Sequence, residues 1–137
     1  MDKRLFYLLN MARHRVYRVA DQQCEETLDV SVTQLGALLV VAANEGCQLK
    51  EVAQSLNLNN SALTGLAGRM EQRGLLERRA CEEDGRSSRL HLTDLGRQKI
   101  DSAKPMIQAL NDHMTEGFSN DEITVILRFL NRLVEEF

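Results

Sequence analysis

Small, polar and basic side chains share one face of residues 59–74, a segment that has the spacing of a helix. They are Ser61, Thr64, Gly65, Gly68, Arg69 and Gln72. Two glycines inside a helix cost roughly 0.5–1 kcal/mol each relative to alanine, so their presence needs a reason. Close approach of the helix to the floor of a DNA major groove is one reason, because that groove is wide enough for a helix. Glycines tolerated on a solvated face are the alternative.

A charged hairpin is predicted directly after this helix. Gly74 is predicted to end the helix, and residues 75–80 are predicted to form a short strand. Residues 81–88 form a turn centred on an Asp-Gly pair, and residues 89–92 alternate polar and apolar side chains as a return strand would. A helix followed by a hairpin with arginines at its tip indicates DNA binding, since the helix can enter the major groove and the hairpin arginines can enter the minor groove.

The net charge of −3 argues at first against a nucleic-acid partner, but the charge is unevenly distributed. Residues 61–99 hold eight Arg or Lys against six Asp or Glu, whereas residues 100–137 hold three against seven. Phosphate contacts need local cations within a Debye length of about 8–10 Å rather than a basic protein. If DNA is the partner, four arginines should form one continuous basic face. They are Arg69, Arg73, Arg86 and Arg89.

The elements that position these residues begin with a capping box. Ser31 and Gln34 have the spacing that starts a helix, and residues 44–46 close it. A shorter helix is predicted at residues 48–56, and Asn59 or Asn60 is a good N-cap for the helix described above. A short helix, a turn and a second helix with a polar outer face predict a helix-turn-helix, which the hairpin extends to a winged helix-turn-helix.

Three amphipathic helices are predicted outside this core. One covers residues 3–27, one runs from Thr93 to about residue 116 with a kink or break at Pro105, and one follows a second capping box at Ser119. They are enough for a separate helical layer that joins two copies, although the first helix could fold back onto its own core. The predicted fold is mainly α with a small β-hairpin wing. It comprises a dimerisation helix at 1–30, a winged helix-turn-helix DNA-binding lobe at 31–96 and C-terminal dimerisation helices at 97–137.

Other classes of function have no signal in the sequence. No apolar run approaches 18 residues and no signal-peptide pattern is present, so we expect a cytoplasmic protein that does not span a membrane. No nucleophile–base pair, phosphate loop or paired acidic motif is present, so we do not expect an enzyme. Cys24, Cys47 and Cys81 form no Cys-x-x-Cys pair and group with no histidine, which fits free thiols in a reducing compartment. We therefore expect neither a metal site nor a cofactor.

An ordered set of short motifs covers about half of the chain, from residue 28 to residue 96. Its residues are Leu28, Val30, Ser31 and Gln34; Glu51, Val52, Ala53 and Leu56; Leu63 and Thr64; Met70, Glu71, Gly74, Leu75, Leu76 and Arg78; Asp84, Gly85, Arg86 and Ser87; and Leu92, Thr93 and Gly96. Each motif is common, but the ordered set at these spacings is specific. It resembles the multiple-antibiotic-resistance regulator (MarR) family of bacterial transcription factors.

The resemblance implies a homodimer that binds a palindromic operator in double-stranded DNA. Each subunit would place a recognition helix in the major groove and a wing arginine in the minor groove. The positions carried over are Ser61, Thr64 and Arg69 on the recognition helix, Arg86 at the wing tip, and Asp84, where the family often pairs an aspartate with an arginine to stiffen the wing. Gly65 and Gly68 depart from the pattern, because many members have larger or charged side chains there.

Many members of the family repress a nearby operon and release DNA when a small, often aromatic or phenolic, ligand binds. The resemblance thus implies an effector crevice near the first helix, where Arg13 and Tyr17 would suit an aromatic carboxylate. A solvated surface arginine is the alternative for Arg13. The leading interpretation is a homodimeric DNA-binding repressor released by such an effector. The alternatives are a thiol-based redox-responsive regulator using Cys24 or Cys81, and a winged-helix protein-interaction module without DNA.

Overall fold

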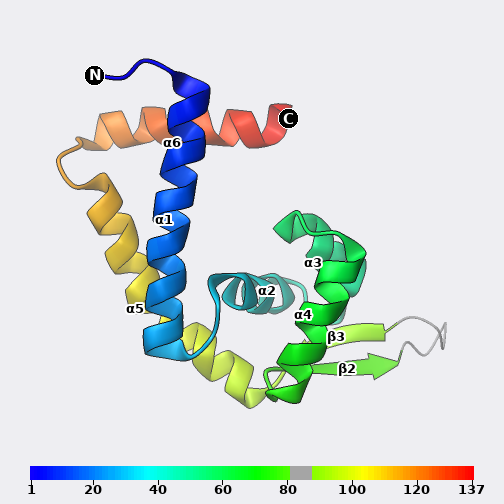
Figure 1. Cartoon of the computed structure of the whole chain (residues 1–137). Helices are drawn as coiled ribbons and strands as arrows, with labels where there is room; N and C mark the ends of the chain where they lie inside the picture. Colours follow the sequence, from blue (N-terminus) through cyan, green and yellow to red (C-terminus); the bar gives the residue numbers. More distant parts are fainter. Residues whose placement is uncertain (81–87) are drawn as a thin grey trace. The chain divides into compact units, whose positions relative to one another are not determined.

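The computed structural model describes residues 1–80 and 88–137 and confirms a mainly α fold with a small antiparallel sheet. It divides into two compact units, Met1–Lys104 and Pro105–Phe137 (Figure 1). The first unit contains the helix-turn-helix and the sheet, and the second contains the end of α5 and all of α6. The three-part division of the chain into dimerisation and DNA-binding segments stays a prediction.

Four helices precede the wing: α1 (Leu5–Leu28), α2 (Val32–Ala43), α3 (Leu49–Leu56) and α4 (Asn60–Gln72). The capping box predicted for α2 is confirmed, since the Ser31 hydroxyl accepts a hydrogen bond from the Gln34 amide at 3.0 Å. Asn59 is the N-cap of α4, and its side chain accepts from the Ala62 amide at 2.7 Å. These two caps fix where the helices that carry the candidate site begin.

The sheet has three antiparallel strands in the order β1–β3–β2, namely β1 (Cys47–Gln48), β2 (Leu76–Ala80) and β3 (Ser88–Leu92). The two predicted strands are confirmed to within one residue at each end. Strand β1 was not predicted; it places Cys47 opposite Leu90. The expected turn lies largely at residues 81–87, so Cys81, Asp84 and Arg86 lie outside the described residues.

The core of the first unit joins the helix-turn-helix to the wing. Its fully buried side chains include Leu38 from α2, Leu63 and Met70 from α4, and Leu90 from β3. At Gly96, on the first turn of α5 (Asp94–Thr115), a Cβ would overlap the main-chain carbonyl of Leu75. The start of α5 therefore lies directly against the segment that joins α4 to β2.

The sequence predicts a kink or a break at Pro105, and the break does not occur, because α5 is a single helix from Asp94 to Thr115. A proline removes one helical hydrogen bond, and the carbonyl left without that partner belongs to Asp101, an exposed residue that water can reach. The capping box predicted at Ser119 is confirmed as the start of α6 (Asn120–Glu136). No residue of α6 is buried.

Exposed large apolar side chains are concentrated on two helices, α1 and α6. The amino-terminal part of α1 exposes Leu5, Phe6, Tyr7, Leu8 and Leu9, and α6 exposes Val125, Ile126, Leu127, Leu130 and Val134. Within α1 only Ala20, Cys24 and Leu28 are buried. Within the described chain, no single helix is long and apolar enough to cross a membrane; α1 and α2 meet that criterion by length and composition only as a pair bent by 79°.

Candidate nucleic-acid interface

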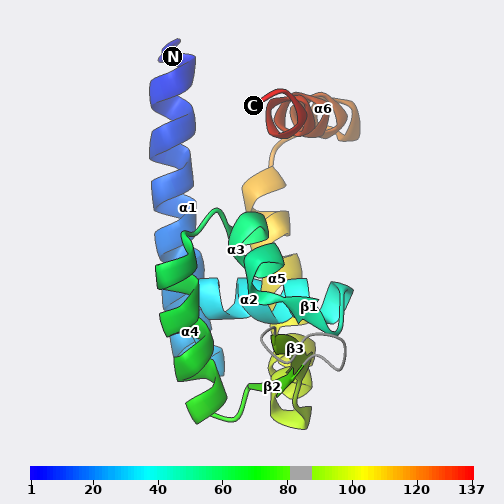
Figure 2. The same cartoon turned by 90° about the vertical axis from the view of Figure 1, so that its right-hand side faces the viewer.

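Helix α4 has one buried face and one exposed face, as its sequence predicts. The buried face consists of Leu63, Leu66, Ala67 and Met70. Ser61, Thr64, Gly65 and Arg69 are exposed on the other side, and Gly68 is half-buried. Figures 1 and 2 show α4 at the outside of the first unit, with β2 and β3 beside its carboxyl-terminal end. The polar face of α4 is therefore open to a partner.

The exposed face of α4 is shallow around its two glycines. At Gly68 no heavy atom lies within 4 Å of the place that a Cβ would occupy. At Gly65 the neighbour is Arg69 Nη1, 3.3 Å from that place, so the arginine side chain lies back along the helix over Gly65. The Thr64 hydroxyl donates to the Asn60 carbonyl at 2.8 Å. A flat surface can thus approach the α4 backbone at Gly68, with the Arg69 guanidinium beside it.

Arg73, which the sequence predicts as a DNA contact, has its guanidinium bound within the fold. Its guanidinium donates to the main-chain carbonyl of Asp29, to Asp29 Oδ2 at 3.1 Å and to Gln34 Oε1 at 3.2 Å. Asp29 is the left-handed C-cap residue of α1, and Gln34 belongs to the first turn of α2. Arg73 therefore ties the end of α4 to the α1–α2 turn and positions the helix.

Arg89 is also bound within the fold. Its Nη1 donates to the Gly46 carbonyl at 2.8 Å, which joins β3 to the turn before β1. Nearby on β2, the Arg78 guanidinium pairs with Glu71 of α4 at 2.5 Å. Of the four arginines expected to form one basic face, Arg73 and Arg89 are thus bound within the fold, Arg69 is exposed on α4 and Arg86 lies outside the described residues, so the continuous face stays a prediction. The prediction treated every arginine in this region alike, although several hold the fold together.

Arg79 on β2 is an exposed cation that the sequence did not single out. It pairs with Glu77, two residues away on the same face of β2, with an Nε–Oε1 distance of 3.2 Å. The Arg79 guanidinium lowers the pKa of the Glu77 carboxyl, and the pKa of Arg79 is raised in turn by Glu77. Because both side chains are more than half exposed, the pair is open to competition from other anions, phosphates included.

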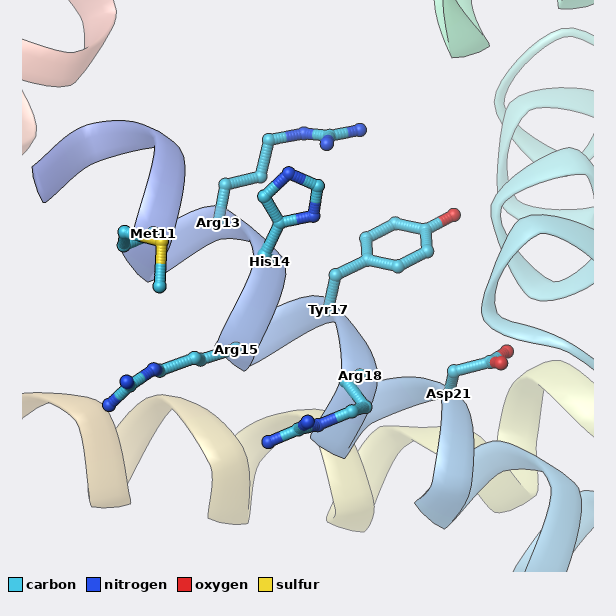
Figure 3. A pocket seen from close by; sticks show the side chains of 7 residues that line it. All are labelled: Met11, Arg13, His14, Arg15, Tyr17, Arg18 and Asp21. Carbon is cyan, nitrogen blue, oxygen red and sulfur yellow. The ribbon is translucent and has the colours of Figure 1, made fainter. Parts of the chain in front are cut away.

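The two residues expected to bind an effector lie together on α1. A pocket of about 760 Å³ is lined by Met11, Arg13, His14, Arg15, Tyr17, Arg18 and Asp21, whose side chains are drawn in Figure 3. The Arg13 guanidinium carbon is 5.6 Å from the centre of the Tyr17 ring, within cation–π range. The Tyr17 hydroxyl is 2.6 Å from Thr33 Oγ1, and Asp21 accepts from the Val32 amide at 2.8 Å. The pocket therefore adjoins two contacts between α1 and the first turn of α2.

The two described cysteines are poor candidates for a redox site. Cys24 on α1 and Cys47 on β1 are 0% and 2% exposed. Burial raises the pKa of both thiols, and neighbouring carboxylates raise the pKa further. Since the thiolate is the reactive form, both are held in the less reactive state.

Comparison with known proteins adds to this geometry. The family model described as "MarR family" matches residues 28–87. The HTH-type transcriptional regulator MgrA of Staphylococcus aureus is 24% identical over an alignment of 139 positions, which covers 100% of this chain and 92% of that protein. The S. aureus MepR–DNA complex has a TM-score of 0.89 at 20% identity, covering 99% of this chain and 100% of that chain. The structure of Bordetella bronchiseptica BpsR, from work on regulation of its DNA binding by 6-hydroxynicotinic acid, has a TM-score of 0.85 at 20% identity over 96% of this chain and 99% of that chain.

Proposed function

This chain belongs to the MarR family of winged helix-turn-helix transcriptional regulators, and from that premise we propose that it is a cytoplasmic, homodimeric repressor of transcription. It binds a palindromic operator in double-stranded DNA and is released by a small aromatic or phenolic molecule. The observation that carries the proposal is the exposed face of α4, which is open at Gly68 and carries a cation at Arg69. MepR, which shares the fold, has been crystallised with DNA.

In this proposal α4 enters the major groove and the wing enters the minor groove. Ser61 and Thr64 add hydroxyls to the exposed face of α4, and Gly65 with Gly68 lets the backbone approach the bases. Arg86 is proposed to enter the minor groove, where the negative electrostatic potential attracts arginine. Asp84 is proposed to stiffen the wing. Arg73 and Arg89 act indirectly, since their guanidinium groups bind main-chain carbonyls.

Pairing of two subunits follows from the exposed apolar side chains. Burial of one Leu, Phe or Val side chain contributes about 1.5–3 kcal/mol, and α1 and α6 each expose several. Partner helices can cover them, which leaves two α4 helices related by a two-fold axis. Such a dimer reads two half-sites about one helical turn, roughly 34–36 Å, apart, so the operator should be palindromic.

The test of DNA binding is an electrophoretic mobility shift with the DNA upstream of the chain's own gene, followed by titration at fixed salt. Arg86→Ala should weaken operator binding by about tenfold or more, or ~1.4 kcal/mol, while the melting temperature and dimer state are kept. Lys104→Ala is the matched control, because it removes one exposed cation from α5. No shift with wild-type protein would refute the proposal. Equal affinity of Arg86→Ala and wild type would remove the wing from it.

The proposed effector is an aromatic carboxylate held by Arg13 and Tyr17. It must bind the DNA-incompetent arrangement more tightly, since equal affinity for both arrangements shifts nothing. A tenfold loss of operator affinity requires ~1.4 kcal/mol of coupling, and operator must weaken ligand binding by the same factor. Calorimetry with a panel of aromatic acids, with and without operator, measures both quantities. Absence of binding, together with peroxide-sensitive release that Cys81→Ser lacks, would favour the thiol-based alternative.

A further inference from the structure

The turn between α2 and β1 carries a carboxylate with partners on two later elements. Glu45 Oε1 accepts from Arg97 Nη2 at 2.8 Å, and Glu45 Oε2 lies 3.1 Å from His91 Nδ1. The Leu92 amide donates to Glu45 Oε2 at 3.4 Å. His91 and Leu92 belong to β3, and Arg97 belongs to α5. One side chain therefore joins a turn, the central strand and the helix that follows the wing.

The next residue of the turn extends this contact along β3. The Gly46 amide donates to the Leu90 carbonyl at 2.9 Å, and the Gly46 carbonyl accepts from Arg89 at 2.8 Å. Gly46 has a φ of +83°, and a Cβ on it would stand 3.4 Å from the His91 ring, so glycine is favoured here. Glu45 and Gly46 together contact every residue of β3 from 89 to 92.

We propose that Glu45 is a positioning residue for the wing. It fixes β3 against α2 and α5, and with β3 the whole β2–β3 ribbon, so that the wing tip meets DNA in a fixed relation to α4. The inference rests on the proposed function, in which the wing touches DNA. A two-stranded ribbon is marginally stable by itself, so its direction depends on what holds its base.

The chemistry of the contact suits this role. Glu45 and His91 are 34% and 23% exposed, so their pairing is partly shielded from water. A carboxylate that accepts from a guanidinium makes a charge-assisted hydrogen bond, which is stronger than a neutral one. Glu77 stands opposite His91 on β2, which places a second carboxylate near the ring. The base of the wing is therefore held by directional polar contacts in addition to the apolar side chains Leu90 and Leu92.

Amide hydrogen exchange of the full-length protein without DNA tests the positioning itself. Glu45→Ala should speed exchange of the β2–β3 ladder amides by roughly tenfold, while the amides of α4 exchange as in wild type. Glu26→Ala is the matched control, because it removes an exposed carboxylate whose recorded partner is Gln22 on the same helix. Ladder exchange in Glu45→Ala that equals the control would overturn the inference, whatever happens with DNA.

Operator titration then tests whether the positioning matters for binding. Glu45→Ala should lose about tenfold in affinity in the wild-type background and less than about twofold in the Arg86→Ala background, because both changes act through the same wing. Equal losses in both backgrounds would show a general effect on the fold and overturn the inference. Glu45→Gln keeps one acceptor oxygen, which can serve either the Leu92 amide or Arg97 but not both in their present positions. It should therefore recover part of the affinity, and it replaces Glu45→Ala if that variant fails to fold. Wild-type protein that binds no operator would refute the proposed function, and the exchange experiment would still decide the role of Glu45.

Discussion

Replacing Gly68 by alanine is expected to stabilise the free protein. Gly68 lies inside α4, and no heavy atom stands within 4 Å of a Cβ placed there, so the added methyl has no steric cost. Glycine is about 0.8–1 kcal/mol less favourable than alanine inside a helix, so the gain is up to ~1 kcal/mol. For a chain of this size, that gain corresponds to a rise in melting temperature of roughly 3–4 °C. Urea unfolding followed by circular dichroism measures it.

Gly96→Ala provides the matched contrast, since it is the same substitution in another helix of the same protein. The added Cβ would overlap the Leu75 carbonyl, which is main chain and cannot turn away. Overpacking costs about 1–3 kcal/mol, so the net effect should be destabilising despite the better helix propensity. At Gly65 the neighbour is the flexible end of Arg69, so alanine there should stabilise by less than at Gly68.

A larger side chain at Gly68 separates stability from binding. Leucine is a good helix former, so Gly68→Leu should stay folded, but its side chain fills the space through which α4 is proposed to approach DNA. We expect operator affinity to fall by about tenfold or more, or ~1.4 kcal/mol, in an anisotropy titration at fixed salt. Wild-type affinity for Gly68→Leu would mean that the open backbone at Gly68 is incidental. Destabilisation by Gly68→Ala would refute the reasoning on packing.

Two further predictions concern the thiols and the terminal helices. Cys24 and Cys47 should react with a thiol reagent only as the protein unfolds. Burial raises the pKa of both thiols in the folded state, so the folded protein holds their protons more tightly than the unfolded chain does. The free energy of unfolding should therefore be unaffected by these thiols below their ordinary pKa of about 8.5 and should fall as the pH rises above it. Fast labelling of both thiols under native conditions would contradict this. Removal of residues 1–27 or 119–137 should cause aggregation or monomerisation with lost operator binding, and a soluble truncated dimer in sedimentation would refute the role of that helix.

The local signals of the sequence predicted the fold well. Ser31, Asn59 and Ser119 start helices as expected, because an N-cap bonds an amide within three residues of itself. Gly74 follows α4 with a φ of +72°, as a helix-ending glycine should. Arg13 and Tyr17 lie together because residues four apart share a helix face. These features depend on short stretches of chain, which is why spacing alone could reveal them.

Contacts between distant residues were not predictable in the same way. Strand β1 has two residues and exists through its pairing with β3, about forty residues later. Glu45 is followed by a turn glycine and has no motif around it, so nothing in the sequence connects it with His91 or Arg97. Pro105 predicted a break that does not occur, because one missing hydrogen bond on an exposed side does not end a helix.

The roles of the arginines were the hardest part of the candidate site, and they lead to a last prediction. Arg73 and Arg89 donate to carbonyls 44 and 43 residues away. The count of arginines in this region therefore overstates the number that we expect to contact phosphates. Each phosphate neutralised adds about −0.9 to the slope of log K against log salt. Arg69→Ala should therefore make the slope of the dimer shallower by about 2, since each subunit loses one cation.

Arg73→Ala should instead lower operator affinity and the free energy of unfolding, and leave the slope of log K against log salt unchanged. The reason is that the Arg73 guanidinium already donates to Asp29 and Gln34. Losing these bonds should cost roughly 1–2 kcal/mol of folding free energy. Titrations of both variants over a series of salt concentrations separate an arginine that meets phosphate from one that holds the helix in place. A shallower slope for Arg73→Ala and an unchanged slope for Arg69→Ala would reverse these assignments and place Arg73 back on the DNA face.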